Sequence, residues 1–265
     1  MKTSEHGESA EVSELSIEQR GDVLWLTIQR ESRRNAINQA VLDGILKGLN
    51  HAQGNRNVRA VVLTGAGGKA FCAGGDLQTS DPFTIDRSNP YVAAADLFRR
   101  ARQLTVPLIA RVNGACFAGG MGLMAMCDLA VAAETATFAL PEIKVGVFPA
   151  QVLGVLHHLL PRRVLYEMCL TGSPITATQA LEFNLLNAIG ADVDATLNAL
   201  LERVLNGSPA AMRRGIYMLK KMESMPFEES ISFAESQIAL FASTEYAQEG
   251  IRAFVEKRQP KWVGR

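Results

Sequence analysis

The stretch GACFAGGMGLMAMCDLA, Gly114–Ala130, places three glycines within four positions, directly before a compact apolar run. These glycines are Gly119, Gly120 and Gly122. Glycine is a poor helix former, so its crowding at the start of a predicted helix calls for a specific reason. The stretch follows PLIARVNG, Pro107–Gly114, which predicts a buried strand, and leads into a second apolar strand, Leu129–Ala133. This succession of strand, glycine loop, helix and strand indicates an α/β fold.

The same order of elements occurs earlier in the chain. VRAVVLTG, Val58–Gly65, predicts a buried strand; the glycine-rich loop GAGGKAFCAGGDL follows, and then a helix over roughly 91–104. Two more strands are predicted around a turn at Gly21–Asp22, and Asn38 is placed to cap a helix that runs to about Gln53. Residues 150–257 are predicted to be helices with short turns. We expect a disordered tail over 1–13, a core over 14–205 and a helical C-terminal region over 206–265.

The composition excludes several classes of protein. The chain has 265 residues, with 27 Lys plus Arg and 27 Asp plus Glu, so its net charge is zero. A neutral chain carries no electrostatic signature for nucleic acid or an anionic membrane, and no apolar run is long enough to span a bilayer. The four cysteines form no CxxC pair, which favours reduced core residues in a cytoplasmic protein.

The two glycine loops suggest an anion site. A glycine loop after a buried strand exposes backbone N–H groups, and the N-terminus of a following helix adds positive potential. Two such loops predict an oxyanion hole that takes one N–H from each, with Gly75 and Gly119 as the natural donors. A nucleotide phosphate loop fits poorly, because Gly65–Ala70 lacks the Walker spacing and the third dinucleotide glycine. Glycines that serve only tight turns and close packing are the other alternative.

One acidic residue is placed unusually. Glu142 lies in the apolar stretch FALPEIKVGVFPA, Phe138–Ala150, directly after Pro141. A carboxylate in apolar surroundings has a raised pKa and can act as an acid or a base. The alternative is a glutamate at a helix N-terminus, stabilised there by the helix dipole.

Other catalytic patterns are missing from the sequence. It contains no GxSxG nucleophile motif and no HExxH or clustered acid–histidine spacing, so we expect no metal site. His157 and His158 are adjacent, and if both are helical they should point to different faces rather than form a ligand pair.

These motifs together resemble the crotonase superfamily, the enoyl-CoA hydratases and isomerases. The resemblance covers about Leu15 to Lys257. The motifs that carry it are RRNAIN at 33–38, AVVLTGAGGKAFCAGGDL at 60–77, ARVNGACFAGGMGL at 110–123, MCDLAVAAETATFALPEIKVGVFP at 126–149 and EGIRAFVEKR at 249–258. The resemblance implies a spiral of ββα units with a helical C-terminal region, and an acyl-CoA thioester as substrate, with no separate cofactor.

The resemblance also implies roles for residues. The thioester oxygen would accept hydrogen bonds from the N–H groups of Gly75 and Gly119, and Glu142 would transfer the proton. Contacts to CoA and substrate are expected at Arg33, Arg34, Ala36, Ala73, Asp76, Leu77, Phe254 and Lys257. In relatives the lysine at the position of Lys257 often reaches CoA from a neighbouring subunit, so we expect a homotrimer or a dimer of trimers.

Gly122 departs from the pattern of the well-known hydratases, which carry a second glutamate at this position. A bacterial branch acting on 3-methylglutaconyl-CoA and isohexenylglutaconyl-CoA, in leucine and acyclic terpene breakdown, is similar and also has glycine there. We therefore expect hydration of a branched enoyl-CoA. The alternatives are a Δ3-Δ2 isomerase with one glutamate and a CoA-binding protein without catalysis. Glycine at 122 is expected to enlarge the acyl pocket. Its expected walls, equally explained as core, are Phe83, Leu97, Phe117, Met121 and Phe148.

Overall fold

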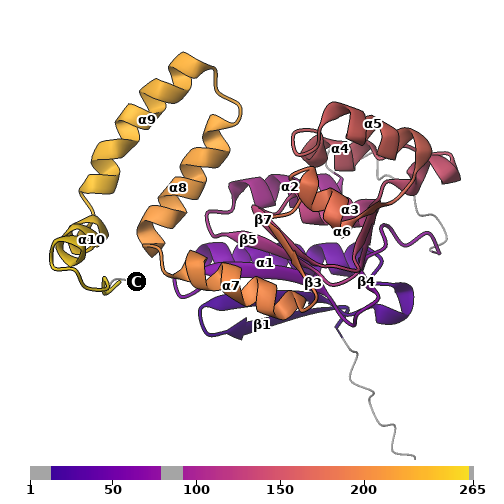
Figure 1. The fold of residues 1–265 in the computed structure, drawn as a ribbon, viewed down its shortest axis with the longest axis horizontal. Helices are drawn as coiled ribbons and strands as arrows, with labels where there is room; N and C mark the ends of the chain where they lie inside the picture. The colour runs from indigo at the N-terminus through magenta and orange to yellow at the C-terminus, as the bar shows by residue number, and fades with distance from the viewer. Residues whose placement is uncertain (1–12, 79–91, 263–265) are drawn as a thin grey trace, which may run out of the picture.

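The computed structural model describes residues 13–78 and 92–262 (Figure 1). The predicted tail (except Ser13) and the predicted wall residue Phe83 lie outside these ranges. The elements are β1 (Leu15–Arg20), β2 (Val23–Ile28), η1 (Glu31–Arg33), α1 (Gln39–Gly54), β3 (Ala60–Gly65), β4 (Ala70–Cys72), α2 (Ala93–Gln103), β5 (Leu108–Val112), β6 (Ala115–Phe117), α3 (Gly119–Ala125), β7 (Leu129–Ala133), β8 (Thr137–Ala139), η2 (Pro141–Val145), α4 (Ala150–Leu156), α5 (Arg162–Thr171), β9 (Ile175–Thr176), α6 (Ala177–Glu182), β10 (Ala188–Gly190), α7 (Val193–Leu205), α8 (Pro209–Met222), α9 (Phe227–Ala242) and α10 (Glu245–Val255).

The larger sheet has six strands in the order β1-β2-β3-β5-β7-β10. Strands β1 and β2 form an antiparallel hairpin, and every other neighbouring pair in this sheet is parallel. Strand β3, AVVLTG, is buried along its whole length. Its nearly continuous apolar sequence follows from this, because a parallel strand covered on both faces has no polar side to show to solvent.

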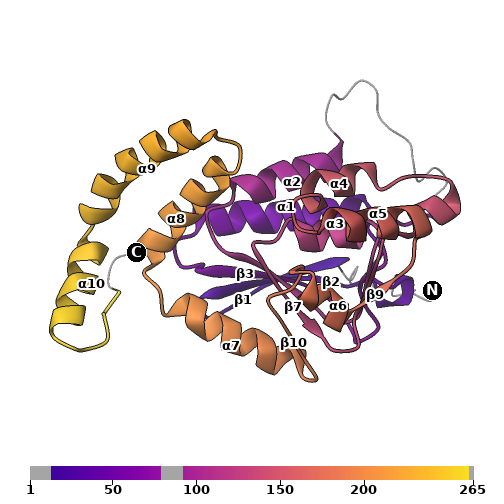
Figure 2. The same cartoon turned by 45° about the horizontal axis from the view of Figure 1, so that its top comes forward.

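Each face of this sheet packs against its own apolar cluster. Val61 and Leu63 belong to the larger cluster, whereas Val62 belongs to the smaller one. The alternation follows from the two-residue period of a strand. Helix α7 covers the smaller cluster, with Leu197 fully buried against it, and Figure 2 shows α7 on the opposite side of the sheet from α1 and α2.

A second, smaller sheet has four strands in the order β4-β6-β8-β9. Strands β4, β6 and β8 are parallel, and β9 pairs antiparallel with β8. Each parallel strand follows one strand of the large sheet along the chain, so β3–β4–α2 and β5–β6–α3 are successive ββα units. The predicted α/β class is therefore confirmed, and the helix cap at Asn38 is present, since its side-chain oxygen accepts from Val41 N–H at 3.0 Å.

The prediction of a purely helical chain after residue 150 was wrong. Strands β9 and β10 lie in that range and extend the two sheets. They have two and three residues, too few for a periodic apolar pattern to distinguish them from turns.

Helices α8, α9 and α10 extend away from the sheets to one side of the molecule (Figure 1). They carry many exposed apolar side chains, including Leu219, Phe227, Ile238, Ile251, Phe254 and Val255. The division between a core and a C-terminal region at residue 205 remains a prediction.

Candidate active site

Three parallel strand ends bring the predicted catalytic residues to one edge of the small sheet. Gly75 follows β4, Gly119 follows β6 and Glu142 follows β8, each within three residues of its strand. Because β4, β6 and β8 run parallel, their carboxyl ends lie side by side. Ligands in open α/β sheets characteristically bind at such strand ends.

The two proposed oxyanion donors are neighbours in space. A Cβ atom built on Gly119 would lie 3.6 Å from the Gly75 nitrogen, and one built on Gly74 would lie 3.4 Å from the Gly119 nitrogen. Ala118 has a φ of 51°, a strained value for alanine, and its N–H donates to Ala139 O at 2.9 Å. Within the described part of the chain, no group accepts a hydrogen bond from the N–H of Gly75 or Gly119. Both donors are therefore available to a ligand oxygen.

Two backbone hydrogen bonds to Ile37 hold the loop that carries Gly75. Ile37 N–H donates to Gly74 O at 2.8 Å, and Asp76 N–H donates to Ile37 O at 2.8 Å. These two bonds lie on either side of the Gly75 N–H and leave it unused. Asn35 is fully buried and donates to Ala66 O and Ala70 O, at 3.0 and 2.7 Å. The RRNAIN stretch thus fixes the first glycine loop.

An ion pair anchors the same loop. Arg30 donates to Asp76 at 2.8 Å and to Glu14 at 2.9 Å, and the side chains of Arg30 and Asp76 are only 11% and 9% exposed. The hydrogen bond from Arg30 lowers the pKa of Asp76. Asp76 was predicted to contact CoA or substrate, and its carboxylate is already engaged with Arg30. Nothing in the local sequence marks Arg30, because its partners lie 16 and 46 positions away along the chain.

Glu142 lies in the first turn of η2, directly after Pro141. Its Oε2 atom is buried, and no described group forms a hydrogen bond with it. Burial raises the pKa of the Glu142 carboxyl, as the sequence predicted. A carboxyl that is partly desolvated and has an unused oxygen has the properties of a general acid or base.

Gly122 lies in α3, and the structure corrects the expectation of an enlarged pocket there. A Cβ built on Gly122 would lie 2.8 Å from Cζ of Phe98 and 3.3 Å from Cγ2 of Val152. Apolar groups from α2 and α4 therefore already occupy the surroundings of a Cβ at 122. Among the expected wall residues, Leu97 and Met121 are core residues with 1% and 0% exposure, and Phe148 is exposed.

The predicted CoA contacts fall into two groups. Arg33, Arg34, Ala36, Ala73 and Leu77 lie around the first glycine loop, where Ala73 N–H donates to Arg34 O at 3.1 Å. Phe254 lies at the end of α10 and Lys257 directly after it, and α10 is on the opposite side of the molecule from β4 (Figure 1). One copy of the chain does not bring these two residues to its own strand ends. Phe254 is 85% exposed.

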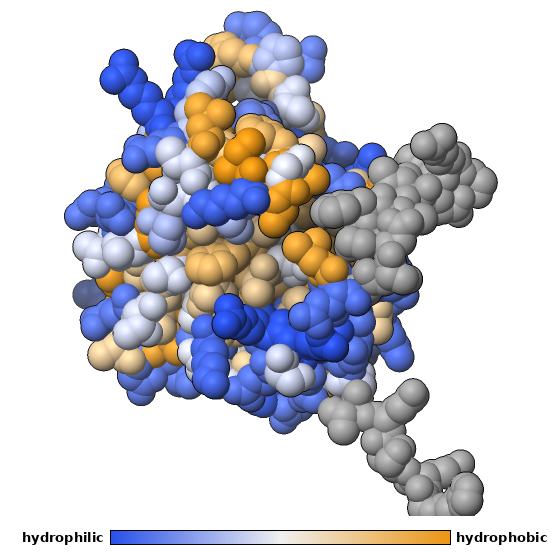
Figure 3. All heavy atoms as spheres, turned by 90° about the vertical axis from the view of Figure 1, so that its right-hand side faces the viewer, coloured by the Kyte–Doolittle hydropathy of each residue, from blue (hydrophilic) through white to orange (hydrophobic). Residues whose placement is uncertain are grey.

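Exposed apolar side chains lie on the segment that follows Glu142 and on α5, which packs against η2. They are Ile143, Val145, Phe148, Tyr166 and Leu170, together with Leu77 in the first glycine loop. Figure 3 shows exposed apolar groups on the side of the molecule that carries α4 and α5 in Figure 1.

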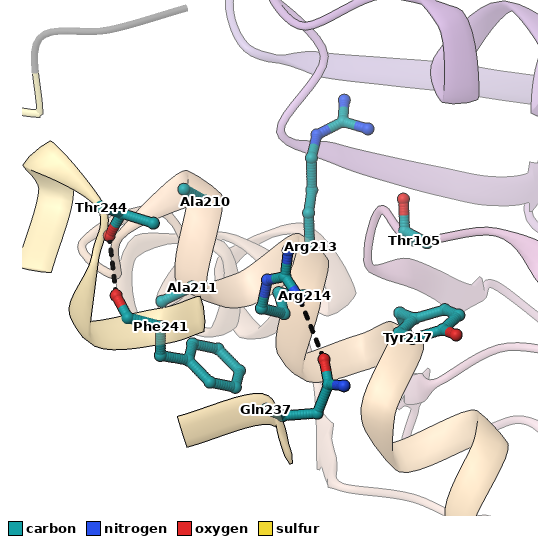
Figure 4. A pocket seen from close by; sticks show the side chains of 9 residues that line it. All are labelled: Thr105, Ala210, Ala211, Arg213, Arg214, Tyr217, Gln237, Phe241 and Thr244. Carbon is teal, nitrogen blue, oxygen red and sulfur yellow. Dashed lines mark hydrogen bonds between the residues drawn. The ribbon is translucent and has the colours of Figure 1, made fainter. Parts of the chain in front are cut away.

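A separate cleft of about 600 Å³ lies between α8 and α9 (Figure 4). Arg214 donates there to Gln237 at 2.9 Å. None of the predicted site residues lines this cleft. The predicted catalytic residues lie instead at the strand ends.

The two histidines lie beyond the helix that the prediction assumed. The rings of His157 and His158 have centroids 3.6 Å apart and are tilted by 43° to each other. Helix α4 ends at Leu156, and the helical rotation assumed for the two residues does not apply beyond it. In the parts of the chain that are described, no group of three or more His, Cys, Asp or Glu is arranged to hold a metal ion. No helix of the described residues is long and apolar enough to cross a membrane.

Comparison with known proteins assigns the family. Residues 18–265 match the family model described as enoyl-CoA hydratase/isomerase, so the chain belongs to that family. It is an enzyme of the enoyl-CoA hydratase class, as predicted, and it has the crotonase fold. The acyl-CoA thioester expected as substrate is the substrate class of this family.

Individual relatives span nearly the whole chain. The chain is 32% identical over 262 residues to 2,3-dehydroadipyl-CoA hydratase of Escherichia coli K12, covering 96% of this chain and 100% of the relative. It is 31% identical over 261 residues to the mitochondrial enoyl-CoA hydratase domain-containing protein 3 of Danio rerio, covering 96% and 89%. A crystal structure of an enoyl-CoA hydratase from Mycobacterium smegmatis superposes with a TM-score of 0.87 at 31% identity, covering 95% and 99%.

Proposed function

We propose that this protein adds water across the 2,3 double bond of an enoyl-CoA thioester, with Glu142 as the one carboxyl that transfers protons. The observation that carries the proposal is the convergence of Gly75, Gly119 and Glu142 at three adjacent parallel strand ends. Two unused N–H groups and a desolvated carboxyl are the parts that addition to a conjugated thioester requires.

One carboxyl is sufficient for both proton transfers of the hydration. The Glu142 carboxylate removes a proton from water as the hydroxide oxygen bonds to C3. The electron pair of the double bond moves to the thioester oxygen, where the N–H groups of Gly75 and Gly119 stabilise the enolate. The protonated Glu142 then returns the proton to C2, and the carboxylate is restored. Enolate stabilisation by two preorganised donors lowers such a barrier by several kcal/mol, in the range of ~3–4 for a single donor.

For the acyl group we propose a 2-enoyl chain with a branch at C3, of the 3-methylglutaconyl or isohexenylglutaconyl type. The support is the apolar surface that Phe98 and Val152 present beside Gly122, which suits a hydrocarbon branch. The names of the relatives cover different acyl groups, so the family alone does not select one.

The single carboxyl also favours a second candidate, Δ3-Δ2 isomerisation. Glu142 would remove a proton from C2 of a 3-enoyl thioester and return it to C4, through the same enolate. No water and no second carboxyl take part in that reaction.

We further propose that a second copy of the chain supplies Phe254 and Lys257 to the site, within a trimer or a dimer of trimers. Two observations support this. Helix α10 lies on the side of the molecule away from the strand ends of its own chain, and α8–α10 carry exposed apolar residues. Mixing two inactive variants, Glu142→Gln and Lys257→Ala, tests this. Mixed assemblies should regain activity through sites that combine an intact Glu142 with an intact Lys257. Light scattering gives the copy number.

A panel of 2-enoyl and 3-enoyl thioesters tests the reaction itself. The panel contains crotonyl-, 3-methylglutaconyl-, isohexenylglutaconyl- and 3-hexenoyl-CoA, and products are followed by mass. Gain of one water supports the hydratase, and a shift of the double bond without change of mass supports the isomerase. Binding of every thioester without any product would refute both. Glu142→Gln is the matched control for background reaction.

A further inference from the structure

The three helices α2, α3 and α4 meet at Gly122. Phe98 comes from α2 and Val152 from α4, and both touch the position where a Cβ of residue 122 would lie. Val152 is 7% exposed and Phe98 is half-buried against the main core cluster. The tip of the phenyl ring is the nearer group, at 2.8 Å.

This contact lies one helical turn from the donor Gly119. Residue 122 is three positions after the donor Gly119 in the same helix, so the two residues lie on the same face, one turn apart. A water molecule beside Gly122 would face a phenyl ring and an isopropyl group, although an ordered water needs two to four polar partners. The groups nearest to Gly122 are therefore apolar and offer no polar partner to water or a charged group.

We propose that Phe98 is a specificity-determining residue that makes this side of the site apolar and selects thioesters with a hydrocarbon substituent at C3. The tip of the ring occupies the position that a second carboxylate at residue 122 would need. The rest of the ring surface would contact the hydrocarbon branch at C3. The inference rests on the proposed function for the placement of the acyl chain. The closure of the space by the ring is independent of any reaction.

Binding of two unreactive thioesters tests the selectivity without turnover. Isovaleryl-CoA and butyryl-CoA differ by one methyl group at C3, and calorimetry gives a Kd for each. The wild type should bind isovaleryl-CoA about fourfold more tightly, the gain expected for one buried methyl-sized group. Phe98→Ala should abolish that preference while the Kd of free CoA stays unchanged. Phe98→Leu, which keeps most of the packing, should reduce it only in part.

A stability cycle tests the closure of the space. Gly122→Ala should lower the melting temperature in the wild-type background and leave it unchanged or raised in the Phe98→Ala background, because the ring that clashes is gone. Gly154→Ala in α4, where an added Cβ meets nothing within 4 Å, is the matched control and should behave alike in both backgrounds.

The outcomes separate the inference from the proposed function. If no thioester in the panel is converted but both binding and stability results hold, the proposed reaction fails and the role of Phe98 stands. An unchanged isovaleryl-to-butyryl ratio in a folded Phe98→Ala variant would overturn the inference. Equal destabilisation by Gly122→Ala in both backgrounds would overturn it as well.

Discussion

Gly119→Ala should lower the activity of this enzyme without a large change in its stability. The new Cβ would lie 3.0 Å from Cδ1 of Ile37 and 3.6 Å from the Gly75 nitrogen. The methyl group would thus border the space between the two N–H donors, where the thioester oxygen is expected. The Gly119 N–H itself would remain, so the substitution tests the space rather than the donor.

The substitution should change the free energy of unfolding only slightly and kcat strongly. Alanine is better than glycine in a helix by about 0.5–1 kcal/mol, and the tight contact is with the terminal methyl of Ile37, which can shift by a few tenths of an ångström. We therefore expect the free energy of unfolding to change by less than about 1 kcal/mol. Displacement of the oxygen from one donor should lower kcat by about 10²–10³, the loss found when an oxyanion-hole donor is removed.

The assay measures kcat and KM on the best thioester of the panel and urea unfolding on the same preparation. Gly215→Ala in α8 is the control, because an added Cβ there meets nothing within 4 Å and the helix is outside the site. It should keep wild-type kinetics. A folded Gly119→Ala protein with wild-type kcat would refute the assignment of Gly75 and Gly119 as the oxyanion donors.

Three further predictions concern the charged groups. Glu142→Gln should lower kcat by about 10²–10⁴ with little change in the Kd of CoA, because the amide keeps the shape of the side chain but cannot accept the proton. An effect on KM alone would contradict this prediction. Burial raises the pKa of Glu142, so kcat/KM for a reaction that needs its carboxylate should fall as pH decreases, at a higher pH than an ordinary glutamate would give; a flat profile across that range would argue against Glu142 as base. Arg30 lowers the pKa of Asp76, so the ion pair stabilises the fold above the pKa of an unfolded aspartate, and this stabilisation is lost as pH falls through the lower folded value. Asp76→Asn should lower the melting temperature at pH 7 and show a smaller further loss on acidification, as thermal scans across pH would reveal.

The sequence predicted the parts of the site that depend on local signals. Gly75 and Gly119 lie in glycine-rich loops that follow predicted buried strands, and the strand, the loop and the next helix succeed one another in the chain. Glu142 is marked by apolar neighbours and a preceding proline, and the burial of its carboxyl follows from the same neighbours. These features need no knowledge of distant contacts.

The rest depends on contacts between distant segments. Arg30 and Asp76 are 46 positions apart, and nothing in either local sequence indicates the ion pair. Phe98 lies in an amphipathic helix, where an aromatic residue is ordinarily a core residue, and only the fold places its ring on Gly122. The local sequence did not predict the small sheet, because β4, β6 and β8 have three residues each and because β4 and β6 lie among glycines.

The crowding of glycines in α3 has a separate cause at each position. At Gly119 a side chain would border the space between the two N–H donors. At Gly120 a Cβ would lie 2.3 Å from the carbonyl oxygen of Cys72, so glycine there permits α3 to pack directly on the end of β4. At Gly122 the space belongs to Phe98. Three glycines weaken a seven-residue helix by roughly 1.5–3 kcal/mol relative to alanine, at 0.5–1 each. Packing of α3 into the main core, where Met121 and Leu123 are buried, offsets this loss. The helix is therefore held by its buried apolar side chains, and its glycines leave room for the backbone donors, the strand end and the phenyl ring.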